Sequence, residues 1–80
     1  MEYKGFEATI RTERLLPPLE GEFHFAARCD RVIYRDPDGS VTELGPLGES
    51  WGRTEREARD EMRREFHSFV DSRPESQHRT

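Results

Sequence analysis

Apolar residues recur at helical spacing in the last third of the chain, and this is its clearest pattern. They lie three or four residues apart, with Arg, Glu and Asp filling most positions between them, at Ala58, Met62, Phe66, Phe69 and Val70. Thr54 and Glu57 form a capping box, in which each side chain can accept a hydrogen bond from a backbone N–H at the helix start. The pattern predicts one amphipathic helix that begins at Thr54 and buries a single apolar stripe.

Two upstream segments alternate apolar and polar side chains, as half-buried strands do. In residues 3–12, one face carries Phe6, Ala8 and Ile10. In the segment that begins near Glu22, one face carries Phe23, Phe25, Ala27 and Cys29. Both segments are therefore predicted to be strands with one face on the core.

Simple alternation fails farther along the second strand, where Val32-Ile33-Tyr34 is apolar at consecutive positions. Either a β-bulge between Cys29 and Arg31 resets the register, or both faces of the sheet are covered there. The bulge is the preferred interpretation.

Turn residues separate these strands. Leu15 to Gly21 contains two consecutive prolines and predicts an irregular connection whose leucines, Leu15, Leu16 and Leu19, pack under the edge of the core. Asp36-Pro37-Asp38-Gly39 is typical of a tight turn, and residues 41–44 return as a third, antiparallel strand. Residues 49–52 lead into the helix, either irregularly or as a very short extra strand.

The order predicts an α+β fold: a three-stranded antiparallel meander with one C-terminal helix packed on one sheet face (β-β-β-α). Residues 1–72 are expected to form a single domain, and residues 73–80 a disordered C-terminal tail. One helix covers one face of such a sheet. The opposite face is expected to meet water or a partner, and it carries Glu7, Thr9, Arg11, His24, Ala26 and Arg28.

Composition limits the choices further. The chain has 80 residues, of which 31% are hydrophobic, so its core is small and dimerisation is a plausible source of further burial. Its net charge of -4 has the wrong sign for a protein that neutralises many phosphates. No apolar run is long enough to span a membrane, and the first residues do not resemble a signal peptide, so a cytoplasmic location is expected.

Candidate sites for chemistry are few. Cys29 is the only cysteine, which excludes an internal disulfide, and no zinc site is expected from Cys29, His24 and His67, since the first two differ in strand parity. The glycine of Asp36-x-Asp38-Gly39 comes too early for a calcium loop. No nucleophile–base arrangement or phosphate-binding loop is evident, so we expect no cofactor, no metal and no enzymatic activity.

Arginines on the helix raise the alternative of nucleic-acid binding. They alternate with acidic residues three or four positions away, which is typical of a self-paired, solvated helix face, at Arg53, Arg56, Arg59, Arg63 and Arg64. Trp51, just before the helix, has two interpretations. It either closes the open end of the core or is an exposed aromatic anchor for a partner.

The helix entry resembles the N-terminal domain of HicB-type antitoxins, on about thirteen residues. The resemblance rests on Pro46-Leu47-Gly48 and on residues 52–58, Gly-Arg-Thr-Glu-Arg-Glu-Ala. It implies a toxin-neutralising module, although the chain inserts a hairpin around Asp38-Gly39 and lacks the family's operator-binding motif. The whole outline is similar to small uncharacterised bacterial proteins of β-β-β-α order, which imply a fold and no activity.

The β-β-β-α order also resembles the later part of double-stranded-RNA-binding domains, without their first helix or their Lys-rich helix start. The leading prediction is a small protein-interaction module, which binds a protein partner or a second copy of itself through the open sheet face or a strand edge. The residues expected to bind the partner are Arg11, Arg28 and Trp51.

Overall fold

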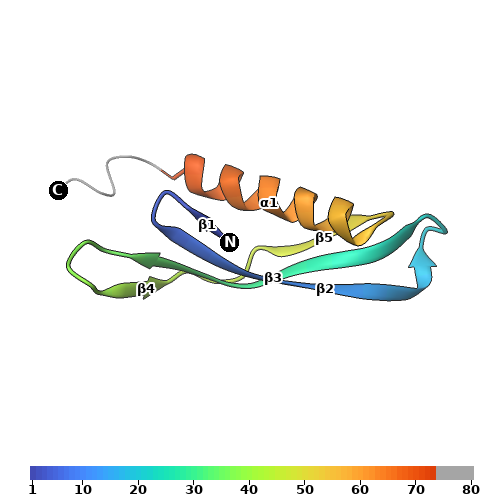
Figure 1. The fold of residues 1–80 in the computed structure, drawn as a ribbon, viewed down its shortest axis with the longest axis horizontal. Helices are drawn as coiled ribbons and strands as arrows, with labels where there is room; N and C mark the ends of the chain where they lie inside the picture. Colours follow the sequence, from blue (N-terminus) through green and yellow to red (C-terminus); the bar gives the residue numbers. More distant parts are fainter. Residues whose placement is uncertain (74–80) are drawn as a thin grey trace.

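The computed structural model describes residues 1–73 and shows an antiparallel sheet with one helix packed on it (Figure 1). The elements are, in order, β1 (Glu2–Tyr3), β2 (Phe6–Leu19), β3 (Phe23–Arg35), β4 (Val41–Glu43), β5 (Gly48–Gly52) and α1 (Glu55–Asp71). This is the predicted α+β fold.

The described part of the chain ends one residue beyond the predicted domain boundary. Of the predicted tail, residues 73–80, only Arg73 belongs to the described part, and residues 74–80 lie outside it. The guanidinium of Arg73 lies over the rings of Phe6 and Phe69, with its central carbon 5.7 and 5.6 Å from their centroids. The packed chain therefore extends at least one residue beyond position 72.

Strand β3 lies at the centre of the sheet. Strand β2 pairs along one side of it, β4 and β5 pair in succession along the other, and β1 adds a short outer strand to β2. Between β4 and β5, the N–H groups of Leu44 and Leu47 still donate to carbonyls of β3, those of Val32 and Cys29, at 2.7 and 3.2 Å. β4 and β5 are thus two parts of one interrupted strand, which completes the predicted meander and includes the predicted extra strand before the helix.

The predicted bulge is confirmed in β3. Thr9 of β2 pairs with Arg31, whereas the next residue, Ile10, pairs with Cys29. This leaves Asp30 as an extra residue in β3, exposed on the sheet surface. The bulge resets the alternation of side chains, so residues on both sides of it reach the core.

The connection between β2 and β3 is not the predicted irregular loop. β2 continues through Pro17 and Pro18 to Leu19, which still pairs with β3. Pairing with β3 is irregular between Arg14 and Leu19, and no described strand lies on the other side, so the prolines can replace donors that the sheet does not need. Leu16 is 80% exposed and Leu19 is also exposed, so the prediction that they pack under the core edge is wrong.

The turn between β3 and β4 has the predicted chemistry. Gly39 adopts a positive φ of 94°, and its N–H donates to the carbonyl of Asp36 at 2.9 Å. The Ser40 hydroxyl lies 3.0 and 2.8 Å from carboxylate oxygens of Asp36 and Asp38. These carboxylates therefore support the turn.

Helix α1 begins and packs largely as predicted. The N–H of Glu57 donates to Oγ1 of Thr54 at 3.1 Å, while the Glu57 carboxylate accepts from the N–H of Arg53 at 3.1 Å, one residue before the cap. The buried stripe consists of Ala58, Met62, Phe66 and Val70, with Phe69 partly buried beside it. These side chains pack on a sheet layer that includes Phe6, Ala8, Ala27, Cys29 and Val32.

The β1–β2 hairpin closes against the end of the helix. The ring of Tyr3 stacks on His67 with centroids 3.8 Å apart, and its hydroxyl donates to Asp71 at 3.1 Å. Nζ of Lys4 donates to the same carboxylate at 2.9 Å. His67 is consequently half-buried.

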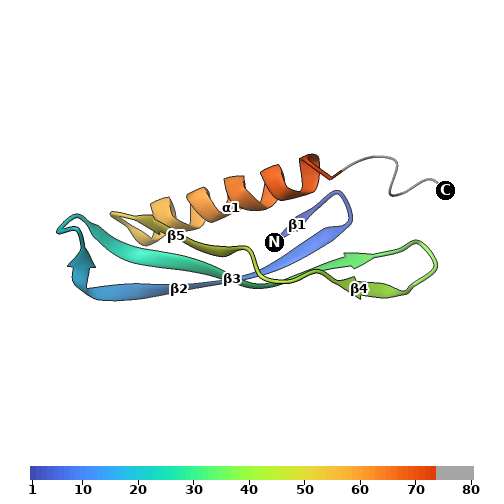
Figure 2. The same ribbon diagram turned by 180° about the vertical axis from the view of Figure 1, so that it is seen from behind.

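The molecule is elongated, with extents of 49 × 20 × 17 Å. Seen from both sides, the hairpin formed by β3 and β4 extends past the C-terminal end of α1 (Figures 1 and 2). The helix therefore covers only part of one sheet face, and no element of residues 1–73 covers the opposite face.

Candidate interaction surface

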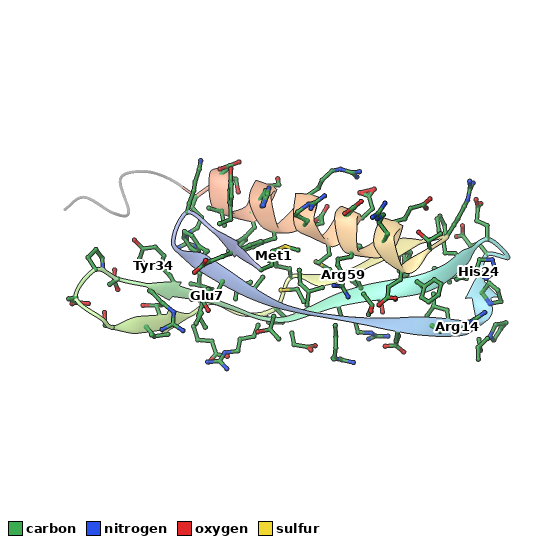
Figure 3. All side chains as sticks on the ribbon, viewed as in Figure 1. Met1, Glu7, Arg14, His24, Tyr34 and Arg59 are labelled. Carbon is green, nitrogen blue, oxygen red and sulfur yellow. The ribbon has the colours of Figure 1, made fainter. Side chains whose placement is uncertain are left out.

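The sheet face opposite α1, called the open face below, carries the polar residues that the sequence assigned to it. The strand register places Glu7 beside Ile33, Thr9 beside Arg31, and Arg11 beside Arg28. Ala26 and His24 continue the same face of β3. In Figure 3 these strands project side chains away from the helix, with no other element over them.

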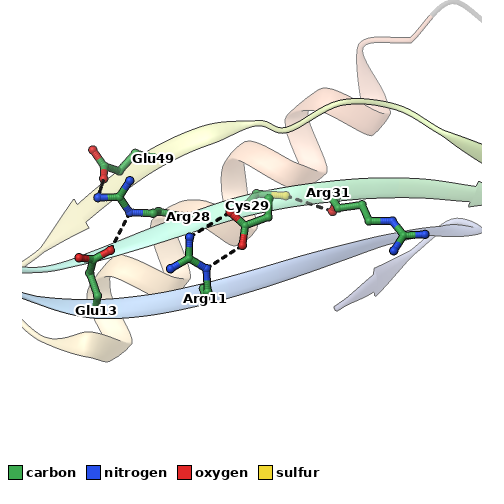
Figure 4. Close-up of polar contacts among 7 residues, drawn as sticks. Arg11, Glu13, Arg28, Cys29, Arg31 and Glu49 are labelled. Atoms are coloured by element: carbon green, nitrogen blue, oxygen red, sulfur yellow. Dashed lines mark hydrogen bonds and ion pairs between the residues drawn. The ribbon is translucent and has the colours of Figure 1, made fainter.

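Arg11 forms an ion pair with Asp30, the extra residue of the bulge in β3. Its Nε and an Nη donate to the two carboxylate oxygens of Asp30 at 2.7 and 3.2 Å (Figure 4). This bidentate hydrogen bonding holds the pKa of the Asp30 carboxyl below its ordinary value. Both side chains are about half exposed, so the pair contributes little to stability.

Arg28 joins three strands of the open face. Its Nε lies 2.8 Å from a carboxylate oxygen of Glu13 in β2, and an Nη lies 2.7 Å from one of Glu49 in β5 (Figure 4). Arg11 and Arg28 are direct cross-strand neighbours, and like charges in that position repel each other. The three carboxylates around them compensate this repulsion.

Ion pairs extend along the rest of this face. Arg35 contacts Glu7, and Nε of Arg31 lies 3.8 Å from a carboxylate oxygen of Glu43. Hydrogen bonding to Arg35 lowers the pKa of Glu7. The arginines of the open face thus have acidic neighbours in the same chain, and the local charge is close to balanced.

Trp51 lies on the open face, so the prediction that it closes the end of the core is wrong. β5 pairs it with Ala26, and its side chain is 42% exposed. Ala26 is fully buried although it belongs to the open face, since it lies between Trp51 on one side and Glu13 on the other. The exposure of Trp51 agrees with the alternative interpretation, an exposed aromatic residue, and its role as an anchor for a partner stays a prediction.

The residues considered for zinc do not come together. His24 is exposed on the open face, Cys29 is buried under the helix, and His67 stacks on Tyr3. Burial raises the pKa of the Cys29 thiol. Within residues 1–73, no group of three or more His, Cys, Asp or Glu side chains could hold a metal ion.

The described surface also has shallow depressions. One of about 240 Å³ lies on the open face between Arg11, Arg28 and Gly48. Another, of about 400 Å³, lies beyond the C-terminal end of α1, and its lining includes Phe6, Tyr34 and Arg73.

Three of the five arginines considered show the predicted self-pairing on the outer face of α1, whereas Arg53 pairs with Glu22, just before β3, at 2.6 Å. Arg59 pairs with Glu55, Arg63 with Asp60, and Arg64 with Glu61, at separations of 3.5, 2.9 and 2.5 Å. Each pair joins residues three or four positions apart on the helix. These arginines lie beside carboxylates that offset their charge.

No protein-family model, curated protein or solved structure matches this chain. The helix in the described part of the chain is too polar to cross a membrane. The function of this chain is therefore inferred from the surface of its described residues.

Sequence reasoning placed Arg11, Arg28 and Trp51 on or near one surface but did not identify the carboxylates around the arginines. Asp30 belongs to the predicted bulge, and a bulged residue often redirects its side chain. Glu13 and Glu49 belong to the strands on either side of Arg28. The alternation of side chains within one strand does not predict the register between strands, so it could not show that these two carboxylates meet Arg28.

Proposed function

We propose that the protein is a small, non-enzymatic protein-interaction module, and that it binds a protein partner through the open face around Trp51. The observation that carries this proposal is a half-exposed tryptophan on a paired strand, surrounded by ion-paired residues. Tryptophan is among the residues most enriched at the energetic centres of protein interfaces.

The position of Trp51 is well defined before any partner binds. Strand β5 pairs with β3 from Gly48 to Gly52, which holds the backbone on both sides of the tryptophan. Ala26, its partner across the strands, is fully buried. A rigid aromatic residue loses little conformational entropy on binding, which favours affinity.

Arg11 and Arg28 have a different role in this proposal. Because both already contact carboxylates, a partner gains little from pairing with them alone. Such a charged rim contributes more to orientation and specificity than to affinity. We therefore assign the main contribution to Trp51 and a secondary one to the arginines.

Nucleic-acid binding is less well supported. Arginines on the open face and on α1 contact acidic side chains, which would have to give way before a phosphate could bind. The antitoxin resemblance remains a hypothesis about the partner, and it predicts a small basic protein bound to this acidic chain.

The test is capture of partners from the host with tagged wild-type protein and two variants. Trp51→Ala should lower partner binding by roughly tenfold or more, as expected for an interface centre. Val41→Ala is the matched control, because Val41 is similarly exposed but lies at the opposite end of the sheet, in β4. Undiminished capture by Trp51→Ala, or capture of nuclease-sensitive nucleic acid instead of protein, would contradict the proposal.

A further inference from the structure

The outer edge of β2 is a long strand edge that no described element covers. β1 accompanies this edge only as far as Ala8, and from Ile10 to Leu19 no described strand pairs with it. The edge on the other side of the sheet is formed by β4 and β5, which are short and interrupted at Gly45-Pro46. Short, interrupted edges are protected against pairing with another chain, whereas the β2 edge is not.

The backbone of β2 presents hydrogen-bonding groups along this edge. Ala8 exchanges two backbone hydrogen bonds with Met1 on the outer side, at 2.7 and 3.1 Å. Alternate residues of a strand direct their N–H and C=O groups to the same side, so those of Ile10, Thr12 and Arg14 also face outward. The extra residue of the bulge belongs to β3, so the alternation of β2 continues through this segment.

The sequence along this edge is complementary to itself in one antiparallel register. When Thr12 lies opposite Thr12 of a second copy, Arg11 lies opposite Glu13 of that copy, and Glu13 opposite its Arg11. Arg11 and Glu13 already pair with Asp30 and Arg28 in their own chain, so these contacts select the register, by placing unlike charges opposite each other, more than they add affinity. Both charge pairs fall at positions without backbone hydrogen bonds, where facing side chains are closest. Ile10 then lies opposite the aliphatic stem of Arg14.

The neighbouring registers that keep the backbone hydrogen bonds are worse. Centring the pair on Arg11 or on Glu13 places like charges opposite each other. Centring the pair on Arg14 places Glu13 opposite Leu15, which loses both charge pairs. Centring it on Ile10 requires pairing with Ala8, whose outward groups are bonded to Met1. The register centred on Thr12 therefore satisfies both the charges and the available backbone.

This register also brings exposed apolar residues together. The paired segment ends where Leu16 of one copy approaches Ala8 of the other and the Met1 bonded to it. Leu16 is 80% exposed and Met1 is 42% exposed in the single chain. The Leu19 end of β2 bends toward the helix side of the sheet (Figure 1). Contact between Leu16 of one copy and Met1 of the other removes apolar surface from water.

We propose that two copies of this protein form a symmetric dimer through antiparallel pairing of their β2 edges, centred on Thr12. The two-fold axis is perpendicular to the sheet, so the two sheets become continuous and both helices lie on the same side. This edge differs from the surface around Trp51, so the dimer and the proposed function can fail independently.

The first test compares Arg14→Pro with Arg14→Ala in the full chain, by light scattering after size exclusion at several protein concentrations. Proline has no backbone N–H, so it removes the outward donor that residue 14 of each copy supplies to the dimer, whereas alanine keeps this donor. Both variants lose the contact between Arg14 and the Phe25 ring, so that loss cancels in the comparison. Wild type and Arg14→Ala should have twice the 9.4 kDa mass of one chain, and Arg14→Pro should have the single mass with an unchanged circular dichroism spectrum.

A wild-type mass of one chain at every concentration would overturn the dimer. If Arg14→Pro remained as dimeric as Arg14→Ala, another surface would join the copies and the β2 edge would be wrong. Trp51→Ala should not change the mass, which separates this result from the test of the proposed function.

A charge exchange tests the register itself and does not depend on the folding of the proline variant. Arg11→Glu alone places Glu against Glu across the two-fold axis, and Glu13→Arg alone places Arg against Arg. Each should raise the dissociation constant of its own dimer, on the order of tenfold. Mixing the two variants restores both opposite-charge pairs, so a heterodimer should form. If mixing restores no association, the register centred on Thr12 is wrong.

Amide hydrogen exchange gives a residue-level readout in the wild type. The N–H groups of Ile10, Thr12 and Arg14 should be protected, and their protection should increase with protein concentration. Rapid exchange at all three positions in a dimeric sample would also overturn the proposal.

Discussion

At the scale of single residues, Gly52 shows how closely the helix start approaches the sheet. A Cβ atom at this position would lie 2.4 Å from the backbone nitrogen of Ala58 and 2.8 Å from the carbonyl carbon of Glu57. Backbone atoms of a capped helix cannot move aside as a flexible side chain can. The absence of a side chain at Gly52 therefore permits the contact between β5 and the first turn of α1.

Gly52→Ala should destabilise the protein by about 1–3 kcal/mol through overpacking. Gly45→Ala is the control, because a Cβ there would meet nothing within 4 Å and Gly45 does not have a positive φ. Chemical denaturation of both variants provides the comparison. Equal stabilities for the two variants would show that the helix does not approach β5 as described.

At the scale of elements, α1 is determined by its own sequence more fully than any strand. Its cap, its buried stripe and its self-paired outer face all involve residues three or four positions apart, so they are local. β2 is the opposite case. Its continuation past the prolines depends on the absence of a described strand beside it and on irregular pairing with β3.

Phe66→Ala should cost about 3–5 kcal/mol, because Phe66 is fully buried at the centre of the helix stripe. That loss is comparable to the whole stability of a small domain, so the variant should unfold or come close to unfolding. Glu65→Ala changes the adjacent, exposed position and should alter stability by less than about 0.5 kcal/mol. A loss below about 1 kcal/mol for Phe66→Ala would contradict the helix packing.

At the scale of the whole molecule, charged contacts join elements that are distant in the sequence. Hydrogen bonds from Arg35, Arg11 and Lys4 lower the pKa values of Glu7, Asp30 and Asp71. The Ser40 backbone N–H similarly lowers the pKa of Asp38. In each case the folded protein favours the ionised carboxylate.

These shifts predict that acid destabilises the protein. Because the folded pKa values lie below the unfolded ones, the unfolded chain binds more protons as the pH falls. The stabilisation is complete above the unfolded carboxyl pKa values, near 4, and is lost as the pH drops through the folded values. Thermal unfolding should show a melting temperature that falls steadily from pH 5 to pH 3.

Asp30→Asn isolates one contribution to this acid response. The variant should melt at a lower temperature than wild type at pH 7, and the difference should shrink at pH 3, where Asp30 is increasingly protonated in the wild type. A wild-type melting temperature that rises on acidification would contradict the assignment of these ion pairs.

The sequence by itself determined the helix, its cap and phase, the two faces of the first two strands and the Asp-Pro-Asp-Gly turn, and it favoured the bulge near Asp30 over the alternative that both sheet faces are covered. Each of these depends on the spacing of residues close together in the chain, and periodicity and turn chemistry report that spacing directly. The same local rules placed Arg11 and Arg28 on the open face.

Only the tertiary structure decided which residues meet across the sheet. Glu13 and Glu49 reach Arg28, Tyr3 stacks on His67, and Trp51 lies beside Ala26 on the open face. Alternation assigns a side chain to a face, but the register between strands sets its neighbours, and that register depends on the bulge and on the whole core. For the same reason, the uncovered β2 edge became visible only once every strand had been assigned its partners.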